Sequence, residues 1–116
     1  MKITLNDIGG KIAKQDERYT VTDNTTLNNL VLSSTRLEPL KSTNGHSHVG
    51  QEEVYMFIEG SGKIDLDDST IDFCKGDIVL IENNVFHRVH AGPEGAYFVC
   101  VFDGYRYDKH VVLGYN

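Results

Sequence analysis

The chain has 116 residues, enough for one domain with a single buried core, and its formal net charge is −6 at pH 7. Its 11 Lys and Arg residues are spread along the sequence rather than clustered, which argues against a nucleic-acid-binding protein. No stretch approaches the ~20 consecutive apolar residues of a membrane span, and the first residues contain no apolar signal region. We therefore expect a cytoplasmic protein that binds neither nucleic acid nor a membrane.

The predicted elements are short β-strands along the whole chain. Apolar runs alternate with clusters of Gly, Asn, Asp or Pro, a pattern typical of an all-β sandwich or closed barrel. We expect an N-terminal arm or strand over residues 1–26 and a barrel core over residues 27–103. The Tyr-rich segment 104–116 is predicted to pack on the barrel or on a dimer interface, with a solvated tail as the alternative.

The predicted strand at residues 27–37 contains one cation, Arg36. Its side chain shares a face with Leu30, Leu32 and Ser34 because alternate residues of a strand point the same way. If that face looks into the barrel, Arg36 is a candidate to bind an anionic group of a substrate. The alternative is a solvated arginine at the edge of the sheet.

The next segment, Gly45–Gly60, begins with two histidines and two glutamates. In extended backbone, the Cα atoms of His46 and His48 lie about 6.6 Å apart and the imidazoles point to one side. Imidazole nitrogen and carboxylate oxygen are ligands of divalent transition metals, so Glu52 or Glu53 is a candidate third ligand. The segment is thus either a metal site or a polar turn between two strands.

The strand that follows has two different faces. One carries Glu53, Tyr55 and Phe57, and the other carries Glu52, Val54, Met56 and Ile58. Alternation alone does not say which of the two faces the interior.

The second half of the chain continues with strand patterns. Residues 65–70 predict a hairpin turn, and residues 77–82 predict a buried strand. His87 shares a face with Val85 and Val89, which predicts a buried imidazole that needs a polar partner. It is either a metal ligand or a core histidine bonded to its neighbours.

The His and Glu pattern resembles the first motif of the cupin superfamily, G-x5-H-x-H-x3,4-E-x6-G. His46, Ser47 and His48 are followed after four residues by Glu53 and after six more by Gly60. The match begins at the first histidine, because Leu40 occupies the position of the leading glycine.

The later residues resemble the second cupin motif, G-x5-P-x-G-x2-H-x3-N. Gly76 and His87 are in register, whereas Glu82 replaces the proline, Asn84 the glycine and Ala91 the asparagine. Asn tolerates the left-handed conformation nearly as well as Gly, so His87 keeps its place as a candidate ligand.

The resemblance covers about residues 27–103. It implies a double-stranded β-helix, a jelly-roll-like barrel, with one divalent transition metal (Mn, Fe, Ni, Co or Zn) bound by His46, His48, Glu53 and His87. It places Tyr55 near the metal, where the phenol can act as an acid or base or can be a core residue, and makes Phe57 a wall of the substrate pocket.

The resemblance leaves the reaction open. We expect a small-molecule substrate and a homodimer, and our leading hypothesis is a non-redox isomerase, epimerase or lyase acting on a carbohydrate or sugar acid. The alternatives are an Fe(II) dioxygenase of a small molecule and a cupin that binds a ligand without turning it over.

Overall fold

The computed structural model describes residues 1–104 and confirms the all-β fold, since these residues contain strands and no α-helix. None of them lies in a helix long and apolar enough to cross a membrane. The strands in chain order are β1 Lys11–Gln15, β2 Tyr19–Asn24, β3 Leu30–Leu37, β4 Glu53–Leu66, β5 Ser69–Cys74, β6 Ile78–Ile81 and β7 His87–Asp103.

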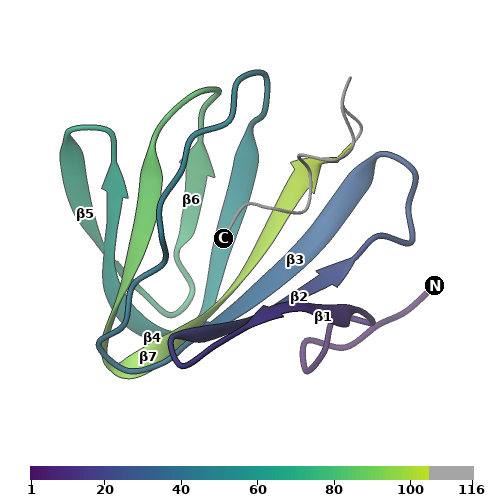
Figure 1. Ribbon diagram of the computed structural model, residues 1–116, viewed down its shortest axis with the longest axis horizontal. Coiled ribbons are helices and arrows are strands. Elements are labelled where there is room, and N and C mark those ends of the chain that lie inside the picture. Colours follow the sequence, from purple (N-terminus) through teal and green to yellow (C-terminus); the bar gives the residue numbers. More distant parts are fainter. Residues whose placement is uncertain (105–116) are drawn as a thin grey trace.

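All strand pairs are antiparallel and follow the order β1-β2-β3-β7-β4-β5, with β6 paired to β4. The two longest strands, β4 and β7, bend together, and each contributes to both halves of the fold. Figure 1 shows this bend at the bottom of the view, with β5 and β6 on one side and β1–β3 on the other. The sheet thus curls into the jelly-roll-like barrel that the sequence predicts.

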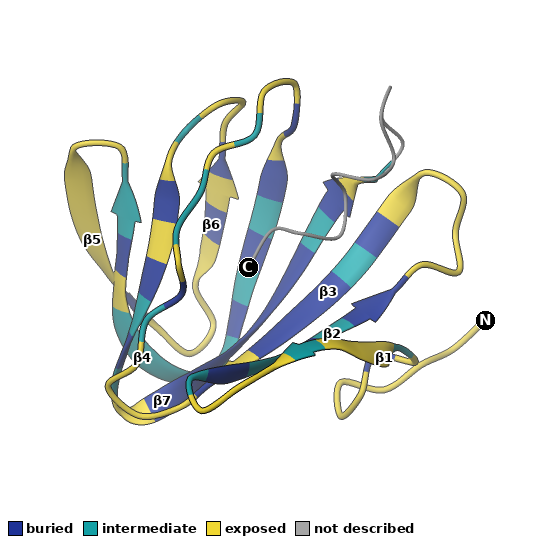
Figure 2. Cartoon of the chain, viewed as in Figure 1, coloured by how far each residue is buried: buried dark blue, intermediate teal, exposed yellow. Residues whose placement is uncertain are grey.

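The core fills the space between these two walls (Figure 2). Buried residues alternate with more exposed ones along β2, the first half of β4 and β6, whereas β7 is buried continuously over residues 95–100. Aromatic and β-branched side chains of β4 and β7 dominate it, as expected for strands that present one face to a core. Its largest fully buried side chains are Tyr55, Phe57, Phe98 and Phe102.

Strand β6 corrects one expectation. Only Val79 and Ile81 are buried, whereas Ile78 is 62% and Leu80 71% exposed. The run of apolar residues predicted a strand covered on both faces, but β6 pairs with β4 alone among the described residues, so one face remains on the surface.

The N-terminal residues add to the sheet, because β1 and β2 extend it beyond β3. Residues before β1 cover part of the outer surface, where Ile8 packs with Tyr97 and Val99 of β7. The Tyr97 hydroxyl donates a hydrogen bond to the carbonyl of Leu5. The predicted role of residues 104–116 lies outside the described residues, apart from Gly104, whose N–H donates to Asn29.

The backbone explains several of the motif positions. Asn84 has φ of 65°, which confirms that asparagine supplies the left-handed turn in place of glycine. Gly60 has φ of 83°, and a Cβ there would overlap the carbonyl of Gly95 on the bent strand β7. Leu40, at the position of the missing leading glycine, is also left-handed, with φ of 63°.

The conformation of Leu40 makes a prediction about stability. A left-handed leucine costs about 1–2 kcal/mol, and the side chain is 73% exposed, so little packing offsets the strain. We expect Leu40→Gly to be as stable as wild type or up to about 1 kcal/mol more stable, because the greater freedom of unfolded glycine cancels part of the gain.

Leu40→Val is the matched variant, and we expect it to be the least stable of the three because a β-branched residue fits left-handed backbone poorly. Urea denaturation of the wild-type protein and the two variants measures the differences in their free energy of unfolding. A valine variant as stable as the glycine variant would show that this turn carries no strain.

Candidate metal centre

The centre begins with a backbone pairing between two histidines. His46 lies in the segment between β3 and β4 and bridges to His87 at the start of β7. The two residues exchange both backbone bonds, at 3.0 Å and 2.9 Å, so their side chains emerge on the same side of the pair. Their ring centroids lie 4.5 Å apart.

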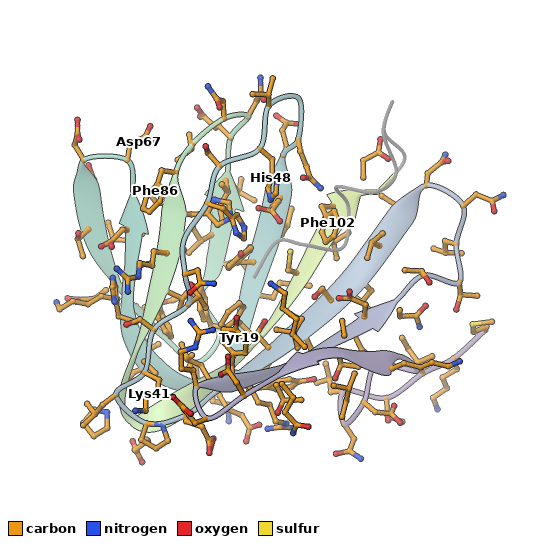
Figure 3. The ribbon with its side chains drawn as sticks, in the orientation of Figure 1. Tyr19, Lys41, His48, Asp67, Phe86 and Phe102 are labelled. Atoms are coloured by element: carbon orange, nitrogen blue, oxygen red, sulfur yellow. The ribbon has the colours of Figure 1, made fainter. Side chains whose placement is uncertain are left out.

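The third histidine joins from the same segment. The ring centroid of His48 lies 4.5 Å from that of His46 and 6.4 Å from that of His87. Its carbonyl accepts a hydrogen bond of 3.0 Å from the backbone of Asn84, which ties the segment to the turn before β7. Figure 3 shows His48 at the same end of the barrel as Phe102.

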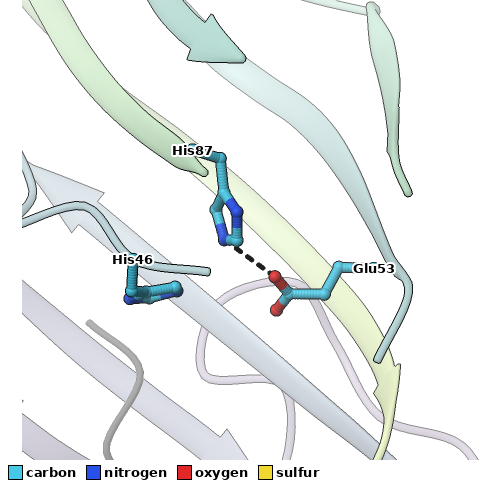
Figure 4. Close-up of side chains that lie close together, drawn as sticks. All are labelled: His46, Glu53 and His87. Atoms are coloured by element: carbon cyan, nitrogen blue, oxygen red, sulfur yellow. Dashed lines mark ion pairs between the residues drawn. The ribbon is translucent and has the colours of Figure 1, made fainter. Parts of the chain in front are cut away.

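Glu53, the first residue of β4, brings a carboxylate to the histidines. Its side chain is buried, and Oε2 lies 2.8 Å from Nε2 of His87 (Figure 4). The neighbouring Glu52 is exposed on the opposite face of the chain. Glu53, and not Glu52, therefore lies beside the histidines.

A second contact orients the imidazole of His87. Nδ1 lies 3.0 Å from the carbonyl of Val85, and a carbonyl only accepts, so Nδ1 carries a hydrogen. The lone pair of a neutral ring is then on Nε2, facing the Glu53 carboxylate. Two acceptors at this distance repel unless a cation lies between them, so the contact marks the place of a proton or a metal ion.

The pKa values of His46 and Glu53 are shifted in the directions that favour cation binding. Burial, reinforced by His87 and His48, lowers the pKa of His46 to about 3, so its ring is neutral near pH 7. Burial is the largest single influence and opposes ionisation of Glu53, but the combined effect of His87, His46 and His48 outweighs it and the pKa of the carboxyl is lowered. Neutral imidazoles and an ionised carboxylate are the forms that bind metal.

The second oxygen of Glu53 is also supported. Cys100 on β7 is buried and donates from Sγ to Oε1 over 3.5 Å. Burial and the nearby carboxylate raise the pKa of this thiol, so it stays protonated as a donor. This partner was not predicted from the sequence, although Cys100 and Tyr55 pair across the two strands and the alternation of β7 could have identified it.

The geometry fits one divalent transition metal. Potential ligand atoms of His46, Glu53 and His87 all lie within 4.8 Å of one another. Two ligands bound to one ion at about 2.1 Å are at most about 4.2 Å apart, so small side-chain rotations bring the set into range. His48 is adjacent and is the candidate fourth ligand.

The other predicted site residues occupy different surroundings. The Tyr55 ring lies 5.6 Å from that of His87 and stacks on Phe98 at 5.2 Å, while Phe57 is buried against Phe73 at 3.8 Å. Arg36 is not brought to the centre.

Arg36 lies on the outer face of β3, with its guanidinium 4.0 Å from the Tyr97 ring and 3.4 Å from Glu59. Its side chain is half exposed. The inward face of β3 carries the opposite set of residues, which includes Ser33 and Thr35. The predicted contact of Arg36 with a substrate therefore has no support in the geometry.

Comparison with known proteins identifies the family to which the chain belongs. The sequence model described as "cupin domain" matches residues 34–102, which include the four candidate ligands. No curated protein sequence matches the chain.

Solved structures resemble the fold at low sequence identity. KdgF from Halomonas sp. aligns with a TM-score of 0.72 and 13% identity over 82% of this chain and 86% of its own. An RmlC-like cupin from Shewanella frigidimarina aligns with a TM-score of 0.73 and 17% identity over 86% of this chain and 88% of its own. A mutant of Bacillus subtilis oxalate decarboxylase OxdC aligns with a TM-score of 0.76 and 24% identity. The alignment covers 86% of this chain but only 29% of that protein. These likenesses show the fold.

Proposed function

The chain belongs to the cupin domain family, and we propose that it is a metal-dependent enzyme acting on a small, oxygen-rich molecule. The observation that carries the proposal is the convergence of partly buried His46 with buried Glu53 and His87 on one point. A buried cluster of this kind is costly to fold without a cation, and perturbed titratable groups of this kind gather at functional sites.

The ligands and their supports have separate tasks. A bound divalent ion would supply Lewis-acid polarisation of a carbonyl or hydroxyl oxygen. His87 is held in one tautomer by Val85, and Glu53 is held by Cys100, so only small rotations of these side chains are needed when a cation binds. The aromatic core beneath them excludes water from that side.

We propose a carbohydrate or sugar acid as the substrate class, with a non-redox isomerisation, epimerisation or elimination as the reaction. The inward face of β3 offers hydroxyl groups at Ser33 and Thr35, both 1% exposed. The Ser33 hydroxyl makes no hydrogen bond within residues 1–104, which suits a partner rich in hydroxyl groups. One structural neighbour is named for oxalate, another small oxygen-rich acid.

The test is a turnover assay on panels of sugars, sugar phosphates and uronates after loading with Mn, Co, Ni, Zn or Fe(II). A non-redox enzyme should act without oxygen and with several of these metals. Turnover that requires Fe(II) and consumes O₂ would overturn the proposal in favour of a dioxygenase. Tight binding of a panel member without conversion would favour the non-catalytic alternative.

We propose Tyr55 as the proton donor or acceptor of the reaction, since its ring lies next to that of His87. Tyr55→Phe should then lower kcat by about 100-fold or more, the usual contribution of a general acid or base, with metal content unchanged. The phenyl ring keeps the stacking on Phe98. A variant with normal kcat would make Tyr55 a core residue only.

The homodimer stays a prediction. Light scattering of the purified protein at several concentrations measures it, and the monomer mass at all of them would contradict it.

A further inference from the structure

A second group of polar side chains lies on the opposite face of β7 from the metal centre. Ser42, in the segment between β3 and β4, has Oγ 2.7 Å from Nδ1 of His90 on β7. The other ring nitrogen, Nε2, lies 2.7 Å from Oδ2 of Asp65 on β4. The side chains of His90 and Asp65 are 33% and 26% exposed, so solvent and small molecules reach them.

The contacts determine where the protons are. Oδ2 of ionised Asp65 only accepts, so Nε2 of His90 carries the hydrogen of a neutral ring. Nδ1 then has the lone pair and accepts the hydroxyl proton of Ser42. The hydrogen bonds from His90 and Thr70 lower the pKa of Asp65, which keeps it ionised. This is the proton arrangement of a serine activated by a histidine base.

The ring nitrogens have exchanged places relative to the usual serine hydrolase triad, in which Nε2 faces the serine. Either neutral tautomer of imidazole offers one donor and one acceptor, so the direction of proton transfer is the same. Asp65 is itself fixed by Thr70, whose hydroxyl donates to Oδ1 over 2.8 Å.

Backbone pairing holds the serine in place. The N–H of Thr43 donates to Val89 at 3.0 Å and that of Ala91 to Lys41 at 2.9 Å, on either side of the pair formed by Ser42 and His90. Within residues 1–104 the N–H of Ser42 donates to no carbonyl. The N–H of a nucleophilic serine is one of the donors that stabilise the oxyanion in serine hydrolases.

Space for a substrate lies beside the imidazole. His90 lines an open groove of about 420 Å³ whose other walls include Gly62, Phe73 and Pro93. These walls are largely apolar, and the lysine at the groove, Lys63, is paired with Asp72 at 2.6 Å. A short uncharged acyl chain fits these surroundings better than an anionic one.

We propose that Ser42 and His90, positioned by Asp65, form a second, metal-independent site that hydrolyses short, uncharged carboxylic esters. Ser42 Oγ bonds to the acyl carbon as Nδ1 of His90 takes its proton. The bond from the acyl carbon to the alcohol oxygen breaks, and the proton passes to that leaving oxygen. Water then attacks the acylated serine by the same proton route, so ester and water give acid and alcohol.

The experiment exposes the full-length protein to an alkyl fluorophosphonate and locates the adduct by mass spectrometry of peptides. We expect the adduct on Ser42, and none there after Ser42→Ala. His90→Ala should slow labelling by about 100-fold or more, the contribution of a general base, and added imidazole should restore part of the rate. Ser69→Ala removes an exposed serine away from the histidine and should label at the wild-type rate.

Hydrolysis of p-nitrophenyl acetate tests the positioning role of Asp65. Asp65→Asn should lower kcat and leave KM unchanged, because the residue does not touch the substrate. Wild-type protein treated with a metal chelator should keep the full esterase rate, which separates this site from the metal centre. The proposal is overturned if folded wild type gives no adduct on Ser42, or if His90→Ala labels at the wild-type rate.

Discussion

Replacing Glu53 by alanine should weaken divalent metal binding by more than about 100-fold, beyond the loss typical of groups that only support a ligand. Glu53 supplies the single carboxylate among the three ligand groups that converge, and its Oε2 already lies 2.8 Å from Nε2 of His87. Competition between the protein and a coloured chelator for Zn(II) or Co(II) measures the loss. Glu53→Gln, which keeps the size of the side chain, should show most of the same effect.

Glu52→Ala is the matched control, because it removes the same chemical group one residue earlier on the chain. Glu52 is exposed, so its removal should leave the affinity unchanged. The reverse outcome, with metal lost from the Glu52 variant and kept by the Glu53 variant, would mean that β4 presents its other face to the interior.

Phe57→Ala should lower the free energy of unfolding by about 3–5 kcal/mol, the range for a buried phenylalanine cut to alanine. The side chain is 1% exposed, and its ring stacks on Phe73 at 3.8 Å and lies 5.4 Å from Phe98. The neighbours come from β5 and β7, so the ring joins both walls of the barrel. Urea denaturation followed by fluorescence or circular dichroism measures the change.

Phe57→Leu should cost less than about 1.5 kcal/mol, because most of the buried volume remains. The comparison also tests the predicted role of Phe57 as a pocket wall. An alanine variant of near wild-type stability that binds substrate poorly would favour the wall, whereas a large loss of stability makes the residue part of the core.

Much of the centre could be predicted from the sequence, because its ligands follow local rules. Strand alternation grouped Glu53 with Tyr55 and Phe57, and all three are buried. The same rule placed His87 inward between Val85 and Val89. Motif spacing selected Glu53 over Glu52, which alternation could not do.

Other features depend on tertiary contacts that no local pattern records. Alternation grouped Arg36 with Leu32 and Ser34, but only the pairing of β3 with β7 decides that this face is the outer one. The exposure of Ile78 and Leu80 follows from β6 pairing with β4 alone among the described residues. An isolated apolar run cannot indicate that one of its faces lacks a covering layer.

The polar partners were the least predictable part. Cys100 donates a hydrogen bond to Glu53, although the two residues lie 47 positions apart in the sequence. Ser42, Asp65 and His90 meet from three segments that come together only when β4 and β7 bend. Each looked ordinary in the sequence, because a single polar residue on an outward strand position is usually solvated.

Elemental analysis of untagged protein purified without chelator, beside a His46→Ala/His87→Ala variant, shows whether these residues hold a metal ion. We expect about one equivalent of Mn, Fe, Co, Ni or Zn in the wild-type protein and its loss from the variant, with the two proteins equally folded by circular dichroism. Wild-type protein that neither contains such a metal nor binds one on titration would contradict the account.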